Sequence, residues 1–381
     1  MAGVRVGLMD PVMAARVRVD AFSRANYLGA VANRVDSYWV PDHINGQTPR
    51  PLWDPKHTAA ARLLRSPDAA MDAWTLLGGL AARRRFNRVR LGIGVTDTGK
   101  RHPAVTAQAA ATLNLMTRGR AILGIGPGER VGNEPYGVDW SKPVARFEEA
   151  LATIRALWES KGQLVNRDSP FFPLRDAMFD LPSYRGKWPE IWVAAHGPRM
   201  LRATGRYGDA WFPGFAHLPK DYAARLDVIR SAASDAGRDP MAITPAFWIP
   251  VVAAANRAAV DAALDTTVVK AWALNAPSDF YAHFGTGHPM GAGFSGMQDH
   301  VAFNIDEPTI LEKSAKVPLE VVKGMMLNGT VDDALDQAAQ WRDHGVRYFV
   351  VVNFGPMQPG LKAGLATMGP FNKVVRGLKR L

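Results

Sequence analysis

The chain has 381 residues, of which 47% are apolar and 21% are charged, a composition that is ordinary for a folded protein. This length accommodates either one large barrel or two ordinary domains. Because the chain contains no cysteine, disulfide frameworks, thiolate metal sites and cysteine nucleophiles are all excluded. The formal net charge of +11 indicates an anionic partner, but leaves nucleic acid, a membrane surface and a phosphorylated or carboxylated small molecule open.

The basic residues show no pattern typical of nucleic-acid binding. The densest run of arginines, between 83 and 90, follows an apolar helical stretch and leads into a strand, so we interpret it as a solvated loop. The N-terminus alternates like a strand and lacks a secretory signal. The longest apolar stretch is far short of the roughly 20 residues that span a bilayer. We therefore expect a cytoplasmic protein with no nucleic-acid partner and no membrane span, which contacts a membrane surface transiently at most.

Strand-like segments alternate with amphipathic helical segments along the chain. Helices are expected over 104–116, 143–158, 199–204, 222–236 and 331–344. Alternation at this rhythm predicts a parallel sheet of the α/β class, and eight strands predict closure into a (β/α)8 TIM barrel. The eight expected strands are 4–9, 37–40, 89–95, 121–125, 191–194, 210–212, 247–252 and 348–352.

Two segments interrupt this alternation. Prolines crowd residues 44–71, after the second strand, and prolines, glycines and aromatic residues crowd residues 272–328, before the last helix and strand. Long insertions at the C-terminal ends of strands are where a barrel builds its pocket and lid. We therefore expect residues 1–381 to form a single barrel domain with these two insertions.

Candidate catalytic residues stand at the ends of expected strands. Asp42 and His43 follow the second strand, where a histidine can exchange a proton and the aspartate either fixes its tautomer or shapes the turn. A turn aspartate beside a loop histidine explains the pair equally well. Glu129 ends a glycine-rich run after the fourth strand, which fails the dinucleotide fingerprint because Pro127 and Glu129 interrupt it. This run either lets a flat ligand approach the backbone or is a turn with a surface glutamate.

Two further places favour ligand contact. Gly92 and Gly94 in the third strand predict either a bulge that a ligand approaches or extra room inside the barrel. His196, Gly197 and Pro198 end a strand and open a helix, whose free amides attract phosphate, although many such loops bind nothing. The remaining histidines show no metal-ligand spacing, so we expect no metal.

Together these motifs resemble the bacterial luciferase-like superfamily, and within it the branch that uses coenzyme F420, a deazaflavin. The resemblance runs from residue 4 to about residue 211 and resumes over 331–352. The motifs that carry it, in chain order, are Asp42-His43, the run 91–95, His102-Pro103, the run 126–129, Asn133-Glu134-Pro135-Tyr136-Gly137, His196-Gly197-Pro198 and the run 203–209.

The resemblance implies where the cofactor lies and which residues act. The deazaflavin ring lies at the C-terminal mouth of the barrel, against a bulge with a non-proline cis peptide, here the Gly94–Val95 bond. Glu129 and His43 are implied as catalytic residues, the two candidates for the acid that protonates a carbonyl oxygen. The residues implied for cofactor binding are Asp42, His43, Gly94, Val95, Thr96, Gly126, Gly128, Asn133, His196, Gly197 and Pro198.

Within this branch the motifs are most similar to ketoreductases. The resemblance implies hydride transfer from reduced F420 to a long-chain lipid ketone of the phthiodiolone type, giving the alcohol, and a homodimer. The alternatives are an FMN-dependent luciferase-like monooxygenase and a non-catalytic flavin- or deazaflavin-binding barrel.

One departure from the family bears on the substrate. Related sugar-phosphate dehydrogenases carry an aromatic residue shortly after the Asp-His pair, whereas this chain reads Ile44-Asn45-Gly46-Gln47. Aromatic residues of the second insertion are expected either to line a pocket for an alkyl chain or to pack the insertion's own core. The candidates for stacking on the substrate are Trp53, Trp74 and Trp248.

Overall fold

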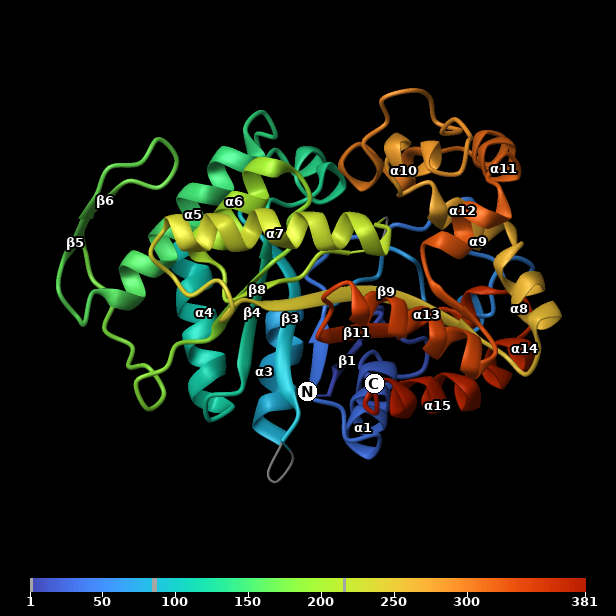
Figure 1. The fold of residues 1–381 in the computed structure, drawn as a ribbon, viewed down its shortest axis with the longest axis horizontal. Coiled ribbons are helices and arrows are strands. Elements are labelled where there is room, and N and C mark those ends of the chain that lie inside the picture. Colours follow the sequence, from blue (N-terminus) through green and yellow to red (C-terminus); the bar gives the residue numbers. More distant parts are fainter. Residues whose placement is uncertain (1–2, 84–87, 215–216) are drawn as a thin grey trace.

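Eight parallel strands form a closed barrel in the computed structural model, which describes residues 3–83, 88–214 and 217–381. The cycle closes because β8 pairs with β9 as well as with β7 (Figure 1). This closure confirms the expected (β/α)8 barrel, and each of the eight expected strands is present. Around the cycle the strands are β1 (Arg5–Met9), β2 (Ser37–Val40), β3 (Arg90–Asp97), β4 (Ala121–Gly126), β7 (Glu190–Val193), β8 (Ala210–Trp211), β9 (Thr244–Ala253) and β11 (Tyr348–Asn353).

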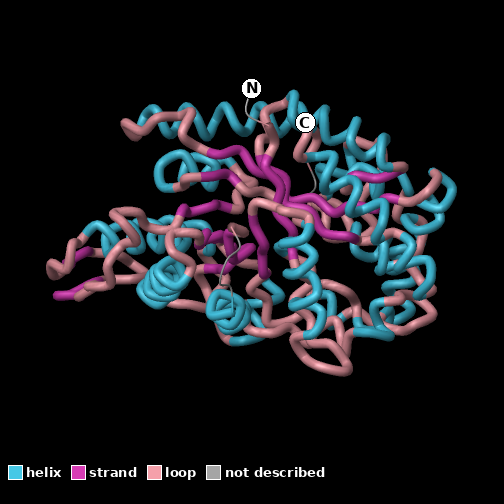
Figure 2. Tube along the Cα trace, turned by 90° about the horizontal axis from the view of Figure 1, so that it is seen from below, coloured by secondary structure: helices cyan, strands magenta, loops and turns pink. Residues whose placement is uncertain are grey.

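Helices surround the strands on the outside (Figure 2). The five helices expected from the sequence are confirmed, with ends within a few residues of the expected positions. No helix in the described residues is long and apolar enough to cross a membrane. The helices that cover the barrel are α1 (Ala21–Ala32), α3 (Ala73–Arg83), α4 (Pro103–Met116), α5 (Pro143–Glu159), α6 (Pro198–Tyr207), α7 (Pro219–Asp235), α13 (Val331–Asp343) and α15 (Met368–Leu378).

The basic run between 83 and 90 lies at the end of α3. Arg83 and Arg88 are exposed, as the interpretation of a solvated loop requires. Arg84 and Arg85 lie outside the described residues. A feature that the sequence did not predict is the two-stranded hairpin after α5, formed by β5 (Val165–Arg167) and β6 (Leu174–Ala177).

The barrel interior is packed with aromatic rings. The ring of Trp39 lies 4.9 Å from that of Trp192 and 4.7 Å from that of Phe212, measured between centroids. Gly92 gives Trp39 its space, because a Cβ at this position would come within 2.5 Å of the indole. Of the two explanations that the sequence left open for this glycine, room inside the barrel is the one that the packing supports.

The first insertion joins the rim of the barrel. It contains η1 (Arg50–Leu52) and α2 (Ala60–Leu63) and connects β2 to α3. Antiparallel bridges link it to the loop after β1, at Met13 with Ala70 and at Ala15 with Leu64. Since both segments follow the C-terminal ends of strands, the insertion lies on that face of the barrel.

The second insertion is a compact group of short helices, at the upper right of Figure 1. Trp272, Phe280 and Tyr281 are buried in a core that the insertion shares with Leu52 of the first insertion and Val252 of β9. Of the two roles that the sequence left open for the aromatic residues of this insertion, packing in a core is the one that the structure supports for these three rings. The elements between β9 and α13 are α8 (Arg257–Leu264), α9 (Thr267–Ala273), α10 (Ser278–Ala282), η4 (Gly296–Gln298), η5 (Ala302–Asn304), α11 (Glu307–Ala315), α12 (Leu319–Gly324) and β10 (Leu327–Gly329).

Candidate active site

Polar side chains from three neighbouring strands meet at the C-terminal end of the barrel. Asp42 and His43 follow β2, Thr96 and Asp97 end β3, and Glu129 follows β4. Because β2, β3 and β4 are adjacent and parallel, their C-terminal ends lie side by side. This end is the active face of (β/α)8 enzymes. The fold therefore gathers residues that the sequence singled out in separate loops.

His43 and Glu129 face each other across this end of the barrel. Nδ1 of His43 lies 3.7 Å from Oε2 of Glu129, and the two side chains are 27% and 23% exposed. The same carboxylate oxygen accepts a hydrogen bond of 2.8 Å from Nε2 of Gln47. The only sequence signal for Gln47 is its place in the stretch where related dehydrogenases carry an aromatic residue. The pair is open enough to exchange a proton with a ligand, while Gln47 fixes the carboxylate.

Asp42 is buried and bonded to β3 and the loop that follows it. Its Oδ2 accepts a hydrogen bond of 2.7 Å from Oγ1 of Thr96 and lies 3.4 Å from Nε of Arg101. Its main-chain oxygen accepts a hydrogen bond from Nζ of Lys100. Of the two roles that the sequence left open, these contacts favour shaping the turn over fixing the tautomer of His43.

Asn133 secures the loop that carries Glu129. It lies between η2 (Arg130–Gly132) and η3 (Glu134–Tyr136), fully buried. Its Nδ2 donates hydrogen bonds of 2.9 Å to the main-chain oxygen of Glu129 and 3.3 Å to Oδ2 of Asp97. Its Oδ1 has no hydrogen-bond partner among the described residues. An acceptor of this kind beside the candidate site can receive a hydrogen bond from a ligand.

Gly128 is required by the same loop. Its φ is +93°, in the left-handed region, and a Cβ there would lie 2.9 Å from Cβ of Asp97. Glycine adopts this conformation without the steric cost that other residues meet. Its presence is explained by the turn, whether or not a ligand lies nearby.

The ends of β3, β4 and β7 form a surface of small side chains. The register of β3 against β4 shifts between Ile93 and Thr96, which marks a bulge. Within it the peptide bond between Gly94 and Val95 is cis, as the family resemblance implies. A Cβ on Gly126 would lie 3.3 Å from Cγ2 of Val95 and 3.5 Å from Cβ of Ala194. A flat ring could approach the backbone closely on this surface.

A pair of histidines stands where β7 leads into α6. Gly197 is the N-cap of α6 and Pro198 its first residue, as the sequence predicts. Nδ1 of His196 lies 3.1 Å from Nε2 of His217, and the two rings are stacked with centroids 5.1 Å apart. Burial lowers the pKa of His217 well below its usual value, and the charges of His196 and Arg225 lower it further. No sequence signal indicates His217.

A cation from α7 lies beside this loop. Arg199, the arginine directly after Pro198, pairs with Glu148 at 2.5 Å between Nη2 and Oε2. Arg225 of α7 instead donates a hydrogen bond of 3.2 Å from Nη1 to the main-chain oxygen of His196. Burial lowers the pKa of this guanidinium. Arg225 is therefore the better placed of the two to attract an anionic group.

The three tryptophans considered for substrate stacking occupy different places. Trp53 packs into a small cluster with Ala60 and Leu64 of the first insertion. Trp74 lies on α3 and packs against the core between strands and helices. Trp248 of β9 borders both the barrel interior and the core of the second insertion, 6.3 Å from Trp272 between ring centroids. Trp248 is the candidate that remains close to the mouth of the barrel.

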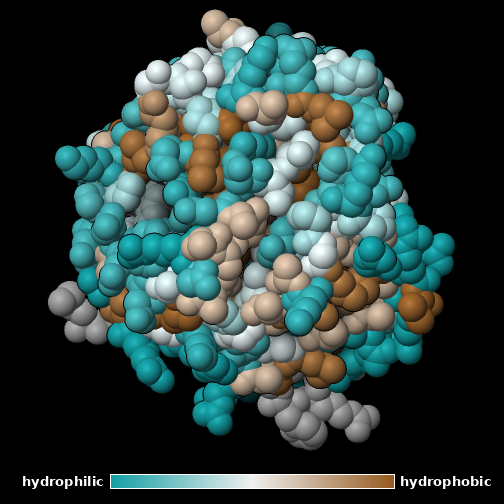
Figure 3. Space-filling model, turned by 90° about the vertical axis from the view of Figure 1, so that its right-hand side faces the viewer, coloured by the Kyte–Doolittle hydropathy of each residue, from teal (hydrophilic) through white to brown (hydrophobic). Residues whose placement is uncertain are grey.

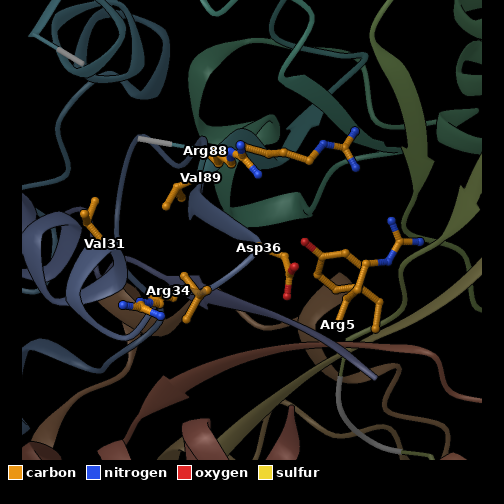
Figure 4. A pocket seen from close by; sticks show the side chains of 9 residues that line it. Arg5, Val31, Arg34, Asp36, Arg88 and Val89 are labelled. Atoms are coloured by element: carbon orange, nitrogen blue, oxygen red, sulfur yellow. The ribbon is translucent and has the colours of Figure 1, made fainter. Parts of the chain in front are cut away.

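A recess of ≈ 550 Å³ lies at the opposite, N-terminal end of the barrel (Figure 4). The guanidinium of Arg5 lies 5.0 Å over the ring of Tyr348, and Arg90 pairs with Glu190 at 2.9 Å. Residues at this end of a (β/α)8 barrel serve stability and not chemistry. In the described part of the chain, no three or more histidine or acidic side chains are arranged to hold a metal ion.

Comparison with curated proteins finds relatives of full length. A phthiodiolone/phenolphthiodiolone dimycocerosates ketoreductase of Mycobacterium sp. (strain JLS) is 63% identical over 381 residues, covering 100% of both chains. The protein of the same name from Mycobacterium tuberculosis (strain ATCC 25618 / H37Rv) is 54% identical over 382 residues, again covering 100% of both.

Comparison with solved structures finds the same fold in enzymes of low identity. An F420-dependent secondary alcohol dehydrogenase in complex with an F420-acetone adduct matches with a TM-score of 0.71 at 18% identity, covering 99% of each chain. A coenzyme F420 dependent tetrahydromethanopterin reductase from Methanopyrus kandleri matches with a TM-score of 0.70 at 19% identity, covering 97% of this chain and 98% of the other.

A family model described as luciferase-like monooxygenase matches residues 33–348, which is most of the chain. This match and the full-length relatives agree with the order of motifs found in the sequence. The chain therefore belongs to the luciferase-like family, and it is an oxidoreductase.

Proposed function

We propose that the protein is a coenzyme F420-dependent ketoreductase that reduces a lipid ketone to the alcohol. The observation that carries the proposal is the facing pair of His43 and Glu129 beside a surface of small side chains at the barrel mouth. The names of the full-length relatives support ketone reduction. The F420-dependent enzymes of the same fold support the choice of cofactor.

The described residues fit a flat cofactor with an anionic tail. Val95, Gly126 and Ala194 leave room for a ring against the backbone. His196, just before the N-terminus of α6, and Arg225 of α7, which is bonded to the main-chain oxygen of His196, provide hydrogen-bonding and positive groups for a phosphate. Buried Oδ1 of Asn133 and Nδ1 of His217 have no hydrogen-bond partners among the described residues. Reduced deazaflavin, when bound, supplies a hydride and no oxygen chemistry.

In the proposed reaction His43 supplies the proton. As the carbonyl carbon gains the hydride, its oxygen gains negative charge and must be protonated. Oε2 of Glu129 is already an acceptor for Gln47 and faces Nδ1 of His43, so the carboxylate balances the charge of a protonated imidazole. The ketone oxygen takes the proton of His43, which recovers it from solvent. Glu129 therefore acts through His43.

The substrate is proposed to be a long-chain ketone of the phthiodiolone type. Support comes from the names of the full-length relatives and from Gln47, which stands in the stretch where sugar-phosphate dehydrogenases carry an aromatic residue. The two cations that lie beside Asp42 are already paired with carboxylates, Lys100 with Asp97 and Arg101 with Asp42, so neither is set up to hold a sugar phosphate.

Two measurements test the proposal. Fluorescence titration should show tighter binding of F420 than of FMN, because the longer anionic tail reaches the loop of His196. Reduced F420 should then convert a detergent-solubilised diketone lipid to its alcohol, with glucose 6-phosphate and oxidised F420 as the comparison. Tighter binding of FMN with an oxygenated product would assign the chain to the monooxygenases, and cofactor binding without turnover of any ketone would leave a binding protein.

A further inference from the structure

The loop after β1 exposes apolar side chains at the rim of the mouth. The main-chain amide of Ala15 donates a hydrogen bond of 3.1 Å to the oxygen of Val19, closing a tight turn. Val17 at its tip is 99% exposed and Val19 is 53% exposed. Main-chain hydrogen bonds of 2.9 and 3.0 Å tie this turn to residues 63–65 of the first insertion. Exposed apolar side chains mark an interaction surface when they form a contiguous patch, so the neighbouring segments decide what these valines mean.

A second exposed apolar segment adjoins the first. After β11 the chain forms η6 (Gly355–Met357) and α14 (Leu361–Ala366). A hydrogen bond of 2.8 Å between the main-chain groups of residues 59 and 358 joins this segment to the first insertion. The exposed apolar side chains here are Leu361, Leu365 and Met368. We refer to segments 14–24, 59–66 and 354–370 together as the rim patch.

The rim patch is strongly cationic. It contains one acidic residue, Asp20, which Arg18 and Arg24 of the patch and Arg83 of α3 share at 2.9, 4.0 and 3.6 Å. One acid against six cations leaves a net charge of +5. The cations are Arg16, Arg18, Arg24, Arg62, Arg65 and Lys362.

The rim patch lies on the same face as His43. Its three segments follow the C-terminal ends of β1, β2 and β11, which are neighbours in the barrel. Figure 3 looks at the side on which α14 lies and shows apolar groups in brown set among hydrophilic ones in teal. Exposed apolar side chains among cations are the combination that binds the interface of an anionic membrane.

We propose that the rim patch docks on a membrane that contains anionic phospholipids, so that a lipid ketone passes from the bilayer into the mouth of the barrel. Valine and leucine side chains enter the interface while the arginines contact lipid phosphates. A second copy of the chain is a poorer occupant, because a two-fold contact would bring two patches of net charge +5 together. The role given to this docking, delivery of a lipid ketone, rests on the proposed function. Membrane binding itself can be measured without that substrate.

Flotation with vesicles tests the docking without any turnover. The full-length protein should float with vesicles of phosphatidylcholine and phosphatidylglycerol, remain in solution with phosphatidylcholine alone, and detach at high salt. Each cation at the membrane surface raises the membrane-binding constant about fivefold. The double variant Arg62→Ala/Arg65→Ala should therefore weaken binding about 30-fold. Val17→Asp/Leu365→Asp should weaken it at least as much. The matched controls, Met241→Asp and Arg88→Ala/Arg118→Ala, alter exposed residues that precede strands and should bind like wild type.

Activity separates this proposal from the proposed reaction. The Val17→Asp/Leu365→Asp variant should reduce a detergent-solubilised ketone at the wild-type rate and lose most activity on the ketone embedded in anionic vesicles. Unchanged flotation of both patch variants would overturn the docking while leaving the reaction intact. Dissociation of a dimer by Val17→Asp/Leu365→Asp, seen by analytical ultracentrifugation, would assign the patch to a second copy and would also overturn it.

Discussion

The coupling between His43 and Glu129 is the quantity that tests the proposed mechanism most directly. If His43 donates the proton, His43→Asn should lower kcat by about 10²–10⁴-fold. Two unit charges about 4 Å apart interact by about 1 kcal/mol in water and about 4 kcal/mol at an effective dielectric constant of 20. The atoms here are 3.7 Å apart and both side chains are about a quarter exposed, so the lower part of that range applies. A coupling of about 1–2 kcal/mol corresponds to about 5–30-fold in kcat.

A double-mutant cycle measures this coupling. Glu129→Gln should lower kcat about 5–30-fold when His43 is present and have little further effect in the His43→Asn background, since Glu129 acts through His43. The rate is followed as oxidised F420 appears, with a detergent-solubilised diketone lipid. Glu134→Gln, an exposed residue of the same loop that pairs with Arg130, is the matched control and should leave kcat unchanged. Equal effects of Glu129→Gln in both backgrounds would refute the arrangement.

Three further predictions follow from single contacts. Gln47→Leu removes a hydrogen bond to the carboxylate and should lower kcat about tenfold without changing the dissociation constant of F420, measured by titration. Burial lowers the pKa of His300 from 6.5 to about 4, and the charge of His288 contributes in the same direction. As pH falls, His300 is therefore protonated in the unfolded chain before it is protonated in the folded one. Stability should therefore fall between about pH 6.5 and pH 4, by up to about 3 kcal/mol, and urea denaturation of His300→Asn should show a weaker dependence. Gly124→Ala places a Cβ 2.0 Å from the main-chain oxygen of Ile93 and should destabilise the fold by about 3 kcal/mol, whereas Gly132→Ala meets nothing within 4 Å and should not.

The barrel could be predicted because its signals are local. Each strand is a short apolar run and each helix an amphipathic pattern, so their alternation carries the topology without any knowledge of distant contacts. The placing of Asp42, His43 and Glu129 at one end follows from that topology alone, since all three come after parallel strands. The cis bond at Gly94 was available only through the family resemblance, because no local pattern marks it.

The partners of the candidate catalytic residues could not be predicted in this way. Gln47 reaches Glu129 across 82 positions of sequence, and His217 reaches His196 across 21, so neither contact leaves a periodic or local trace. In the second insertion, the sequence predicted which residues are buried but not what they are buried against. Its aromatic residues predict burial correctly, but composition does not distinguish a pocket lining from a core, and Trp272, Phe280 and Tyr281 belong to a core.

The net charge acquires a physical meaning once its distribution is known. The rim patch holds five of the eleven excess positive charges in 36 of 381 residues, on the face that carries His43. At the opposite end, Arg90 is paired with Glu190 and Arg5 lies over an aromatic ring. Of the three anionic partners that charge alone left open, a phosphorylated cofactor suits the loop of His196 and a membrane surface suits the rim. A single polyanionic ligand does not explain both the loop of His196 and the rim patch, because it would make no favourable contact with the exposed valines and leucines between the arginines.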